Sequence, residues 1–321
     1  MLNKYDIITI GGATLDTSFT VDEYKVINDF GLDKEKLMAF QYGQKIGIKE
    51  TTTSFGGGAA NVAVASARLG LKTLIVAALG KDDEGQKIYN NLVKHKIAGG
   101  LIQTEHGARS SVSFVLKTLS NDHILFTYRG ANDHLIINRQ AEKKLAKAKR
   151  LYVASLTGNW RNVLTKVMDI KTKIAWNPGR VQLAAGYLAL KPFLTKTDIL
   201  ILNKDEATEL FLSASKDKKV VPLNIMIKKI KSFGPNIVVI TDGLKGALAL
   251  EDKKIIKQAA IKVKAADTTG VGDAFSATLV ASLDHGFSLD KALRFAVKNA
   301  ANVVSKPGAQ NGLLNAAKLG W

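Results

Sequence analysis

Apolar runs alternate with helical patterns along most of the chain, and this alternation predicts the fold class. Runs with the length and composition of buried strands lie at 6–12, 72–80, 150–156, 172–179, 198–203 and 235–243. Helical patterns separate them, among them 59–70, which Gly70 would end, and 82–96, which has acids in its first turn. Buried strands joined by helices predict an α/β fold with a mostly parallel sheet covered on both faces.

A second set of strand-like segments is richer in Ser, Thr and aromatic residues and falls within the first 130 residues. These segments lie at about 14–21, 45–54 and 111–130, and we expect no helix directly after them. We expect antiparallel strands, with a hairpin around 120–122 in the last segment. A small sheet of this kind would form a lid over the carboxyl ends of the parallel strands. The stretch 22–44 fits neither pattern.

Composition excludes several classes of site. The chain has 321 residues, 46% hydrophobic and 23% charged, which is an ordinary balance for a globular protein. It has no cysteine, which rules out disulfides, thiolate chemistry and cysteine-bound zinc. The five histidines form no i,i+4 pair, so we expect no dedicated zinc site.

The net charge of +18 has two interpretations. It would suit a nucleic-acid partner, but the lysines are scattered in small groups without interleaved aromatic residues, so we favour a lysine-rich surface and expect no nucleic acid. A positive field would still attract phosphorylated ligands. No apolar run approaches the roughly 18 residues of a membrane span, and the start lacks a signal-peptide pattern. We therefore expect a cytoplasmic protein with no membrane partner.

The stretch 265–275, AADTTGVGDAF, combines an anion site with an acid. An amphipathic helix pattern begins at Asp273, and the amides of Gly270, Val271 and Gly272 can converge at its positive N-terminal end. A carboxylate beside that hole suits a base that takes a proton from an attacking hydroxyl. The alternative is that Asp273 is an ordinary helix N-cap.

Two other early motifs fit a hydroxyl-bearing ligand. The run 55–61, FGGGAAN, opens a helix but departs from a dinucleotide fingerprint, because Asn61 replaces its third glycine. Close backbone approach at these glycines and hydrogen bonds from Asn61 would suit a polar ligand, whereas a tight turn is the alternative. Asp16 follows the first strand and could accept bonds from two vicinal hydroxyls, unless it is a solvated loop acid.

Two motifs at later strand ends suit a nucleotide and its metal. Asn203 and Glu206 offer oxygen ligands for Mg²⁺ that would act through water, but they also match a helix capping box. Thr241 and Gly243 end a strand, and Gly246 opens the next. Turn chemistry would explain these glycines, and so would a backbone that passes close to phosphates.

These motifs together resemble the ribokinase-like (PfkB) family of carbohydrate and nucleoside kinases. FGGGAANVAVASARLG resembles the family's N-terminal signature and DTTGVGDAFSATLV its C-terminal signature. NKDE matches its NxxE motif, and KPGAQ at 306–310 is similar to its late loop. The resemblance covers nearly the whole chain. It implies that residues 1–321 form one kinase domain, a three-layer sandwich with a central, mostly parallel sheet and a small β-sheet lid that often forms a dimer interface.

The resemblance also implies roles for these residues. Asp273 would be the catalytic base beside the anion hole. The acceptor would bind at Asp16, Gly57, Gly58, Asn61 and Arg129. ATP would bind near Asn203, Glu206, Thr241, Gly243, Gly246, Asn302 and Gly308. Asn203 and Glu206 would organise Mg²⁺, and the carbonyls of Asp267 and Thr269, with the loop 305–311, would suit K⁺ in members that use it.

Departures from the family pattern bear on the acceptor. Ribokinases proper carry lysine where this chain has Gly58, and 154–159 lacks an acid that related sugar kinases often have. YRGAND at 128–133 resembles fructokinase-like members, in which an arginine at the lid edge approaches the acceptor. Arg129 would then contact a hydroxyl, carboxylate or phosphate, with an exposed surface arginine as the equal alternative.

The sequence therefore predicts an ATP-dependent kinase that phosphorylates a primary hydroxyl of a sugar. A nucleoside kinase is the alternative in the same chemistry, since aromatic residues could form a wall for a base. The candidates for that wall are Phe19, Phe40, Tyr42 and Phe114. A non-catalytic sugar-binding or nucleic-acid-binding protein is the alternative from another class, and the intact GVGD and NKDE motifs argue against it.

Overall fold

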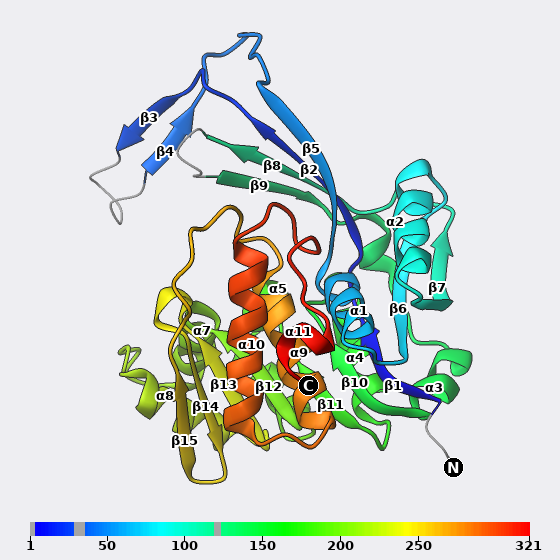
Figure 1. Cartoon of the computed structure of the whole chain (residues 1–321), viewed down its shortest axis with the longest axis vertical. Helices are drawn as coiled ribbons and strands as arrows, with labels where there is room; N and C mark the ends of the chain where they lie inside the picture. Colours follow the sequence, from blue (N-terminus) through cyan, green and yellow to red (C-terminus); the bar gives the residue numbers. More distant parts are fainter. Residues whose placement is uncertain (1–3, 29–35, 119–122) are drawn as a thin grey trace.

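The computed structural model describes residues 4–28, 36–118 and 123–321. Within them, a nine-stranded sheet forms the centre of the molecule (Figure 1). Its strands, in spatial order, are β15 (Lys254–Gln258), β14 (Ala247–Glu251), β13 (Ile237–Thr241), β12 (Ile199–Asn203), β11 (Lys173–Trp176), β10 (Ala148–Val153), β1 (Tyr5–Ile10), β6 (Thr73–Gly80) and β7 (Ala98–Glu105). All neighbouring strands are parallel except at the edge, where β14 and β15 run antiparallel. The predicted fold class is confirmed.

Helices cover both faces of this sheet, so there are two hydrophobic cores. One face carries α1 (Gly58–Arg68), α2 (Asp83–Lys94), α9 (Val271–Asp284), α10 (Leu289–Val304) and α11 (Ala316–Leu319). The other carries α3 (Arg139–Leu145), α4 (Trp160–Met168), α5 (Arg180–Leu183), α6 (Gly186–Leu194), α7 (Lys204–Ala214) and α8 (Leu223–Lys231). The strands between them are apolar on both sides because both sides are covered. None of the described helices is long and apolar enough to cross a membrane.

Helix α9 is not amphipathic as its sequence suggests. Residues 274–282 are all buried, because α9 packs between the sheet, α1 and α10. The hydroxyls that suggested an exposed face are satisfied inside the helix: Thr278 donates to the carbonyl of Ala274, and Ser282 donates to that of Thr278, both at 2.7 Å. The small side chains let neighbouring helices approach closely, so residues 274–282 are held firmly in the interior.

The lid is a second sheet of β5 (Glu50–Gly56), β2 (Thr14–Thr20), β8 (Val112–Lys117) and β9 (His123–Tyr128), in that order. It projects above the carboxyl edge of the central sheet (Figure 1). The expectation of antiparallel strands throughout is wrong, because β2 and β8 are parallel. Both leave the same edge of the central sheet, after β1 and β7, and therefore run in the same direction.

Two further features of the lid differ from the expectations or go beyond them. Strand β5 runs directly into helix α1, through Gly57 at φ 88°, although we expected no helix after a lid strand. The unassigned stretch 22–44 contains an antiparallel ribbon of β3 (Lys25–Asn28) and β4 (Lys36–Ala39). β8 and β9 pair antiparallel as predicted, while the turn expected around 120–122 lies outside the described residues.

Candidate active site

Asp273 lies in the first turn of α9, below the lid. It is the third residue of the helix and not its N-cap, which is Gly270 in the left-handed region at φ 73°. The Nδ2 of Asn61, in the first turn of α1, donates to Oδ2 of Asp273 at 2.8 Å. A Cβ at Gly58 would lie 3.5 Å from Oδ1, which is an ordinary contact distance, and 3.1 Å from the Cβ of Ala154. The carboxylate is thus held between two helix N-termini.

The environment of Asp273 makes it a weaker acid than usual. Burial raises the pKa of its carboxyl to about 6, and the charge of Asp16 adds to this rise, while the hydrogen bond from Asn61 opposes it. A carboxyl with this pKa is mostly ionised at pH 7 and is a better proton acceptor than an ordinary aspartate.

Glycine occurs at positions 270 and 272, before Asp273, for different reasons. A Cβ at Gly270 would lie 2.3 Å from the Cβ of Ala309, so packing and the positive φ both require glycine there. Gly272 is exposed, with open space where a Cβ would be and an ordinary φ. The fold therefore gives no reason for glycine at 272, whereas a ligand close to the free N–H groups of this helix end would.

Asp16 is buried in β2, so it is not a solvated loop acid. Thr14 donates its hydroxyl to Oδ1 of Asp16 at 3.0 Å. A Cβ at Gly56 would lie 2.0 Å from Oδ2, so the neighbouring strand must have glycine for this carboxylate to fit. Burial raises the pKa of Asp16 and hydrogen bonds from Thr14 and Ser113 lower it, with an overall rise.

Asn203 and Glu206 form the capping box that opens α7. The backbone N–H of each donates to the side chain of the other at 2.8 Å. Burial raises the pKa of Glu206, and the Asp273 charge contributes to that rise, so the two carboxylates lie within electrostatic reach. Asn203 is paired with Thr241 across β12 and β13, which places the NKDE motif beside the predicted nucleotide residues.

A hollow of about 360 Å³ lies between the end of β13, the N-terminus of α9 and the side of α10. Its lining includes Thr241, Gly243 and Gly246 of the predicted set, together with Val271 and Gly272 of the anion hole. The rest of the lining is mainly apolar, from Leu244, Ala260, Ile261, Val263, Ala265, Thr268, Phe275, Val297, Ala300, Ala301 and Val304. An apolar slot that ends in free amides fits a nucleotide, with the base in the slot and the phosphates at the helix end.

Asn302, predicted for the nucleotide, does not line that hollow. Its amide donates instead to the carbonyl of Gly312, which fastens the loop after α10 to the helix. Its neighbours Ala301 and Val304 face the hollow. The helical period explains the difference, because Asn302 lies on another face of α10.

Asp267 connects the lid with the loop before α9. Its carboxylate accepts hydrogen bonds from Thr269, from the backbone N–H of Gly308 at 3.2 Å and from the Nζ of Lys117 at 3.1 Å. Burial raises its pKa, but these bonds outweigh burial and bring the pKa to about 2. Lys117 belongs to β8, so this ion pair holds the lid against the body.

The structure adds residues that the sequence did not single out. Asn132 is buried beside Gly12 at the end of β1, and its Oδ1 accepts from the N–H of Ala13 at 3.3 Å. Its position in the YRGAND motif was the available signal. Arg129, the residue singled out there, has an exposed side chain with no hydrogen bond or ion pair to the described residues.

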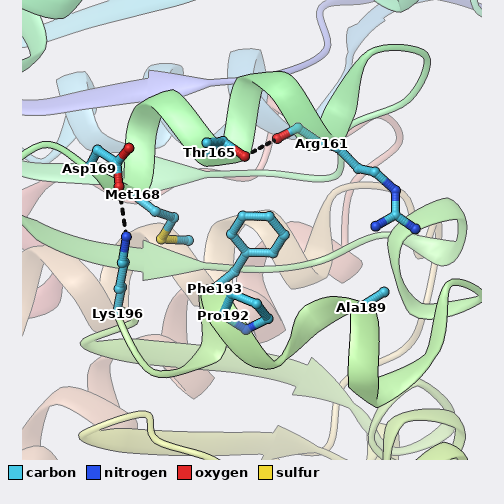
Figure 2. Close-up of a pocket in the computed structure, with 8 residues that line it drawn as sticks. All are labelled: Arg161, Thr165, Met168, Asp169, Ala189, Pro192, Phe193 and Lys196. Carbon is cyan, nitrogen blue, oxygen red and sulfur yellow. Dashed lines mark hydrogen bonds and ion pairs between the residues drawn. The ribbon is translucent and has the colours of Figure 1, made fainter.

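A separate hollow of about 340 Å³ lies between α4 and α6, on the face with the second core (Figure 2). Phe193, Pro192 and Met168 line it, and an ion pair between Lys196 and Asp169 closes one end. The guanidinium of Arg161 extends along its other end, stacked on Trp160. None of the predicted site residues lines this hollow.

Comparison with known proteins agrees with this geometry. A family model described as pfkB family carbohydrate kinase matches residues 19–316. The chain is 31% identical to the ribokinase of Haemophilus influenzae over 268 residues, covering 81% of this chain and 84% of that protein. It is 25% identical to a nucleoside kinase of Methanothermobacter thermautotrophicus over 323 residues, covering 98% and 94%.

The fold matches solved structures as well. The structure of Arabidopsis thaliana ribokinase complexed with ribose and ATP has a TM-score of 0.81 to this chain at 20% identity, covering 99% of this chain and 98% of that one. A likeness at this identity establishes the fold, while the family model and the sequence relatives establish the chemistry. The chain therefore belongs to the pfkB family of carbohydrate kinases and is an ATP-dependent phosphotransferase with an alcohol group as acceptor.

Proposed function

We propose that this protein transfers the γ-phosphoryl group of ATP to a primary hydroxyl of a sugar, and that residues 1–321 work as one kinase unit with a lid. The observation that carries the proposal is the position of the Asp273 carboxylate. It lies in the first turn of α9, beside the free amides of that helix and in contact with Asn61. The proposed base thus lies next to Val271 and Gly272, which line the 360 Å³ hollow.

In this mechanism Asp273 accepts the proton of the acceptor hydroxyl. As that proton leaves, the acceptor oxygen bonds to the γ-phosphorus, the bond from phosphorus to the β,γ-bridging oxygen breaks, and ADP departs. The N–H groups of Gly270, Val271 and Gly272 stabilise the charge on the transferred group. Asp16, Asn61 and the backbone at Gly57 and Gly58 hold the sugar hydroxyls. Positioning and charge neutralisation supply most of the rate, as is usual in phosphoryl transfer.

The metal roles follow from the same groups. Asn203 and Glu206 would hold Mg²⁺ through water, and the carboxylate of Glu206 remains free to do so on the oxygen that is not in the capping box. Bound Mg²⁺ would supply neutralisation of the phosphate charge. For K⁺, the carbonyls of Asp267 and Thr269 and the loop with Gly308 are the proposed ligands, and the Asp267 carboxylate, already bonded to Lys117, stiffens that loop.

The inner face of the lid supports a sugar over a nucleoside. Strand alternation and register put Asp16, Ser18, Ser54 and Ser113 on the same face as Lys117, which contacts the body. This face is rich in hydroxyls, as a polyhydroxy ligand requires.

The aromatic residues that could have formed a wall for a base lie elsewhere. Phe19 and Phe114 belong to the opposite, outer face of the lid. Phe40 is 38% exposed, and Tyr42 is fully exposed.

A nucleoside kinase is the second candidate. Its support is the relative from Methanothermobacter thermautotrophicus, which matches nearly the whole chain, although the Haemophilus ribokinase is more similar in sequence. A non-catalytic binding protein is disfavoured because the chain belongs to a kinase family and keeps the residues proposed as base and anion hole.

The deciding experiment is a screen of ATP consumption by the purified full chain, with and without K⁺. The acceptors are ribose, fructose, ketodeoxygluconate, adenosine, inosine and cytidine. We expect a sugar to give a kcat/KM at least tenfold above every nucleoside. Preference for a nucleoside by the same margin would overturn the assignment of the acceptor, and no turnover with any of them would overturn the proposed substrate class.

We also propose that two copies associate through the outer faces of their lids. Phe114 and Phe126 are paired across β8 and β9 on that face, and they are 44% and 54% exposed. Tyr128 continues the patch at 49% exposure. An exposed aromatic surface of this kind is typical of an interface with another protein surface.

A further inference from the structure

A chain of three side-chain amides leads from the surface of α2 to the carboxylate of Asp273. Asn91 donates from Nδ2 to Oε1 of Gln310 at 3.0 Å. Gln310 donates from Nε2 to Oδ1 of Asn61 at 3.0 Å. Asn61 donates from Nδ2 to Oδ2 of Asp273 at 2.8 Å. We call Asn91, Gln310 and Asn61 the amide relay.

The ionised carboxylate fixes the direction of the whole relay. A carboxylate can only accept hydrogen bonds, so Asn61 must present its nitrogen to Asp273 and its oxygen to Gln310. Gln310 must then present its nitrogen to Asn61 and its oxygen to Asn91. Asn61 and Gln310 each donate on one side and accept on the other. Turning one of these amides alone would therefore bring two acceptors or two donors together.

The relay is well protected from water at its centre. Asn61 is 4% exposed and Gln310 is 7% exposed. An unpaired amide in such a place is unfavourable, so the buried groups favour the one arrangement in which all are paired. Gln310 belongs to the loop after α10, and it joins α1 to α2 across 249 and 219 residues of sequence.

We propose that Gln310 is a positioning residue for phosphoryl transfer, which holds the Asn61 amide with its N–H group toward Asp273, and that Asn91 supports Gln310 in turn. The proposal rests on the proposed role of Asp273 as the base. Without the N–H of Gln310, Asn61 is free to rotate and present its carbonyl oxygen to the carboxylate. Two acceptors then face one another, and this favours the protonated, inactive form of Asp273.

Other charges around Asp273 remain the same in such variants. Asp16 faces it from the lid, Glu206 from α7 and the phenol of Tyr152 from β10. Within the described residues, no hydrogen bond or ion pair joins any of these three side chains to Gln310, so their influence on the pKa of Asp273 is common to all the variants below. A change in that pKa in Gln310→Leu therefore reports on Asn61 and its partners, whereas Gln310→Glu also brings a new negative charge near Asp273.

The test compares the pH dependence of kcat in Gln310→Leu and Gln310→Glu with the wild type. Leucine removes both polar atoms, while glutamate still accepts from Asn91 but presents an acceptor to Asn61. We expect the acid limb of kcat to move up by about one pH unit in Gln310→Leu and further in Gln310→Glu. At pH 6 kcat would fall about fivefold in Gln310→Leu, and at pH 9 it would match the wild type within about twofold.

A matched control is Gln103→Leu. Gln103 also bridges two elements through its side-chain amide, with donor and acceptor bonds to Ile136, but it lies away from Asp273. We expect its pH profile to be that of the wild type. A residue with a merely structural role at 310 would lower kcat by the same factor at every pH, and that result would overturn the proposal.

A measurement independent of turnover separates this inference from the proposed function. The carboxyl of Asp273 can be titrated by ¹³C NMR in aspartate-labelled protein, with its signal assigned by its loss in Asp273→Asn. We expect a higher pKa in both Gln310 variants. An unchanged pKa would refute the relay even if Asp273 is the base, whereas full activity of Asp273→Asn would refute the base and leave this titration valid.

Asn91→Leu provides a second route if a change at the buried position 310 prevents folding. Asn91 is at the outer, half-buried end of the relay, so its loss leaves Gln310 in place with one partner fewer. We expect a shift of the acid limb in the same direction and of smaller size. No shift in a folded Asn91→Leu protein would overturn the supporting role of Asn91.

Discussion

At the scale of single residues, the site depends on a carboxylate that is held rather than merely present. Asp273 is oriented by Asn61, and burial makes it more basic than an ordinary aspartate. The same burial opposes folding with a charged group at this position. The residue proposed as the base is therefore expected to reduce stability, and two predictions follow from this.

The first prediction concerns Asp273→Asn. We expect a folded protein that binds ATP normally but loses a factor of roughly 10²–10⁴ in kcat, because the amide cannot accept the proton. Turnover and ATP affinity, measured by coupled assay and by calorimetry, check this. Near-wild-type phosphorylation would show that Asp273 is not the base.

The second prediction concerns pH and stability. Because the pKa of Asp273 is raised from 3.8 to about 6, activity should be full well above pH 6 and be lost as the pH falls through that value. The folded state also binds this proton more tightly than the unfolded chain does. The free energy of unfolding contributed by Asp273 therefore declines as the pH rises from about 4 to 6. At pH 7 Asp273→Asn should be more stable than the wild type, on the order of 1–3 kcal/mol, in urea unfolding. The same difference in free energy of unfolding between the wild type and Asp273→Asn at pH 5 and at pH 7 would contradict this.

At the scale of elements, the N-terminus of α9 and the lid meet across the site. The helix end is fixed because residues 274–282, which follow its first turn, are all buried between the sheet, α1 and α10. The lid is joined to the loop before α9 by the ion pair of Lys117 and Asp267. A rigid anion hole and a cover attached beside it are what phosphoryl transfer in the absence of bulk water requires.

The third prediction tests the anion hole through Gly272. We expect Gly272→Ala to leave the melting temperature unchanged within about 2 °C, since a Cβ there meets open space, but to raise the KM for ATP by roughly tenfold by obstructing the phosphates. Gly107→Ala is the matched control, because Gly107 also has open space at its Cβ position and lies outside the site. An unchanged KM for ATP in Gly272→Ala would show that the phosphates of ATP do not bind at this helix end.

At the scale of the whole molecule, the two faces of the lid have different characters. Its inner face carries an acid, serines and a lysine toward the body, while its outer face carries exposed aromatic residues. The β3–β4 ribbon adds further exposed apolar side chains, namely Val26, Ile27 and Leu37. A lid built this way can bind a polar ligand on one side and a second copy of the chain on the other.

The fourth prediction concerns that association. We expect the wild type to sediment as a dimer and Phe126→Lys, alone or with Phe114→Lys, to sediment as a monomer, because two charges would be brought into an apolar interface. Leu244→Lys is a control, and we expect it to sediment as the wild type does. Leu244 is 93% exposed, but it lines the 360 Å³ hollow and not the outer face of the lid. A monomeric wild type at all concentrations would refute the proposed interface.

Much of the local structure was predictable because it depends on local patterns. Buried strands, helices and the capping box of Asn203 and Glu206 follow from periodicity and from contacts within a few residues. The burial of α9 was not predictable, since its serines and threonines look polar in sequence and are satisfied by bonds within the helix. The parallel pairing of β2 and β8 depended on the direction in which β1 and β7 leave the central sheet.

The sequence by itself determined the fold class, the type of reaction and the motifs that carry it, because the spacing of glycines and acids around a helix start is a local signal. The tertiary structure alone decided which distant residues meet at Asp273. The links from Asn91 to Gln310, from Gln310 to Asn61 and from Asn61 to Asp273 each span more than 200 residues. Lys117 closes on Asp267, and Asn302 turns away from the hollow proposed for the nucleotide. Contacts of this kind depend on how helices and sheet pack around the core, and no short-range pattern in the chain specifies that packing.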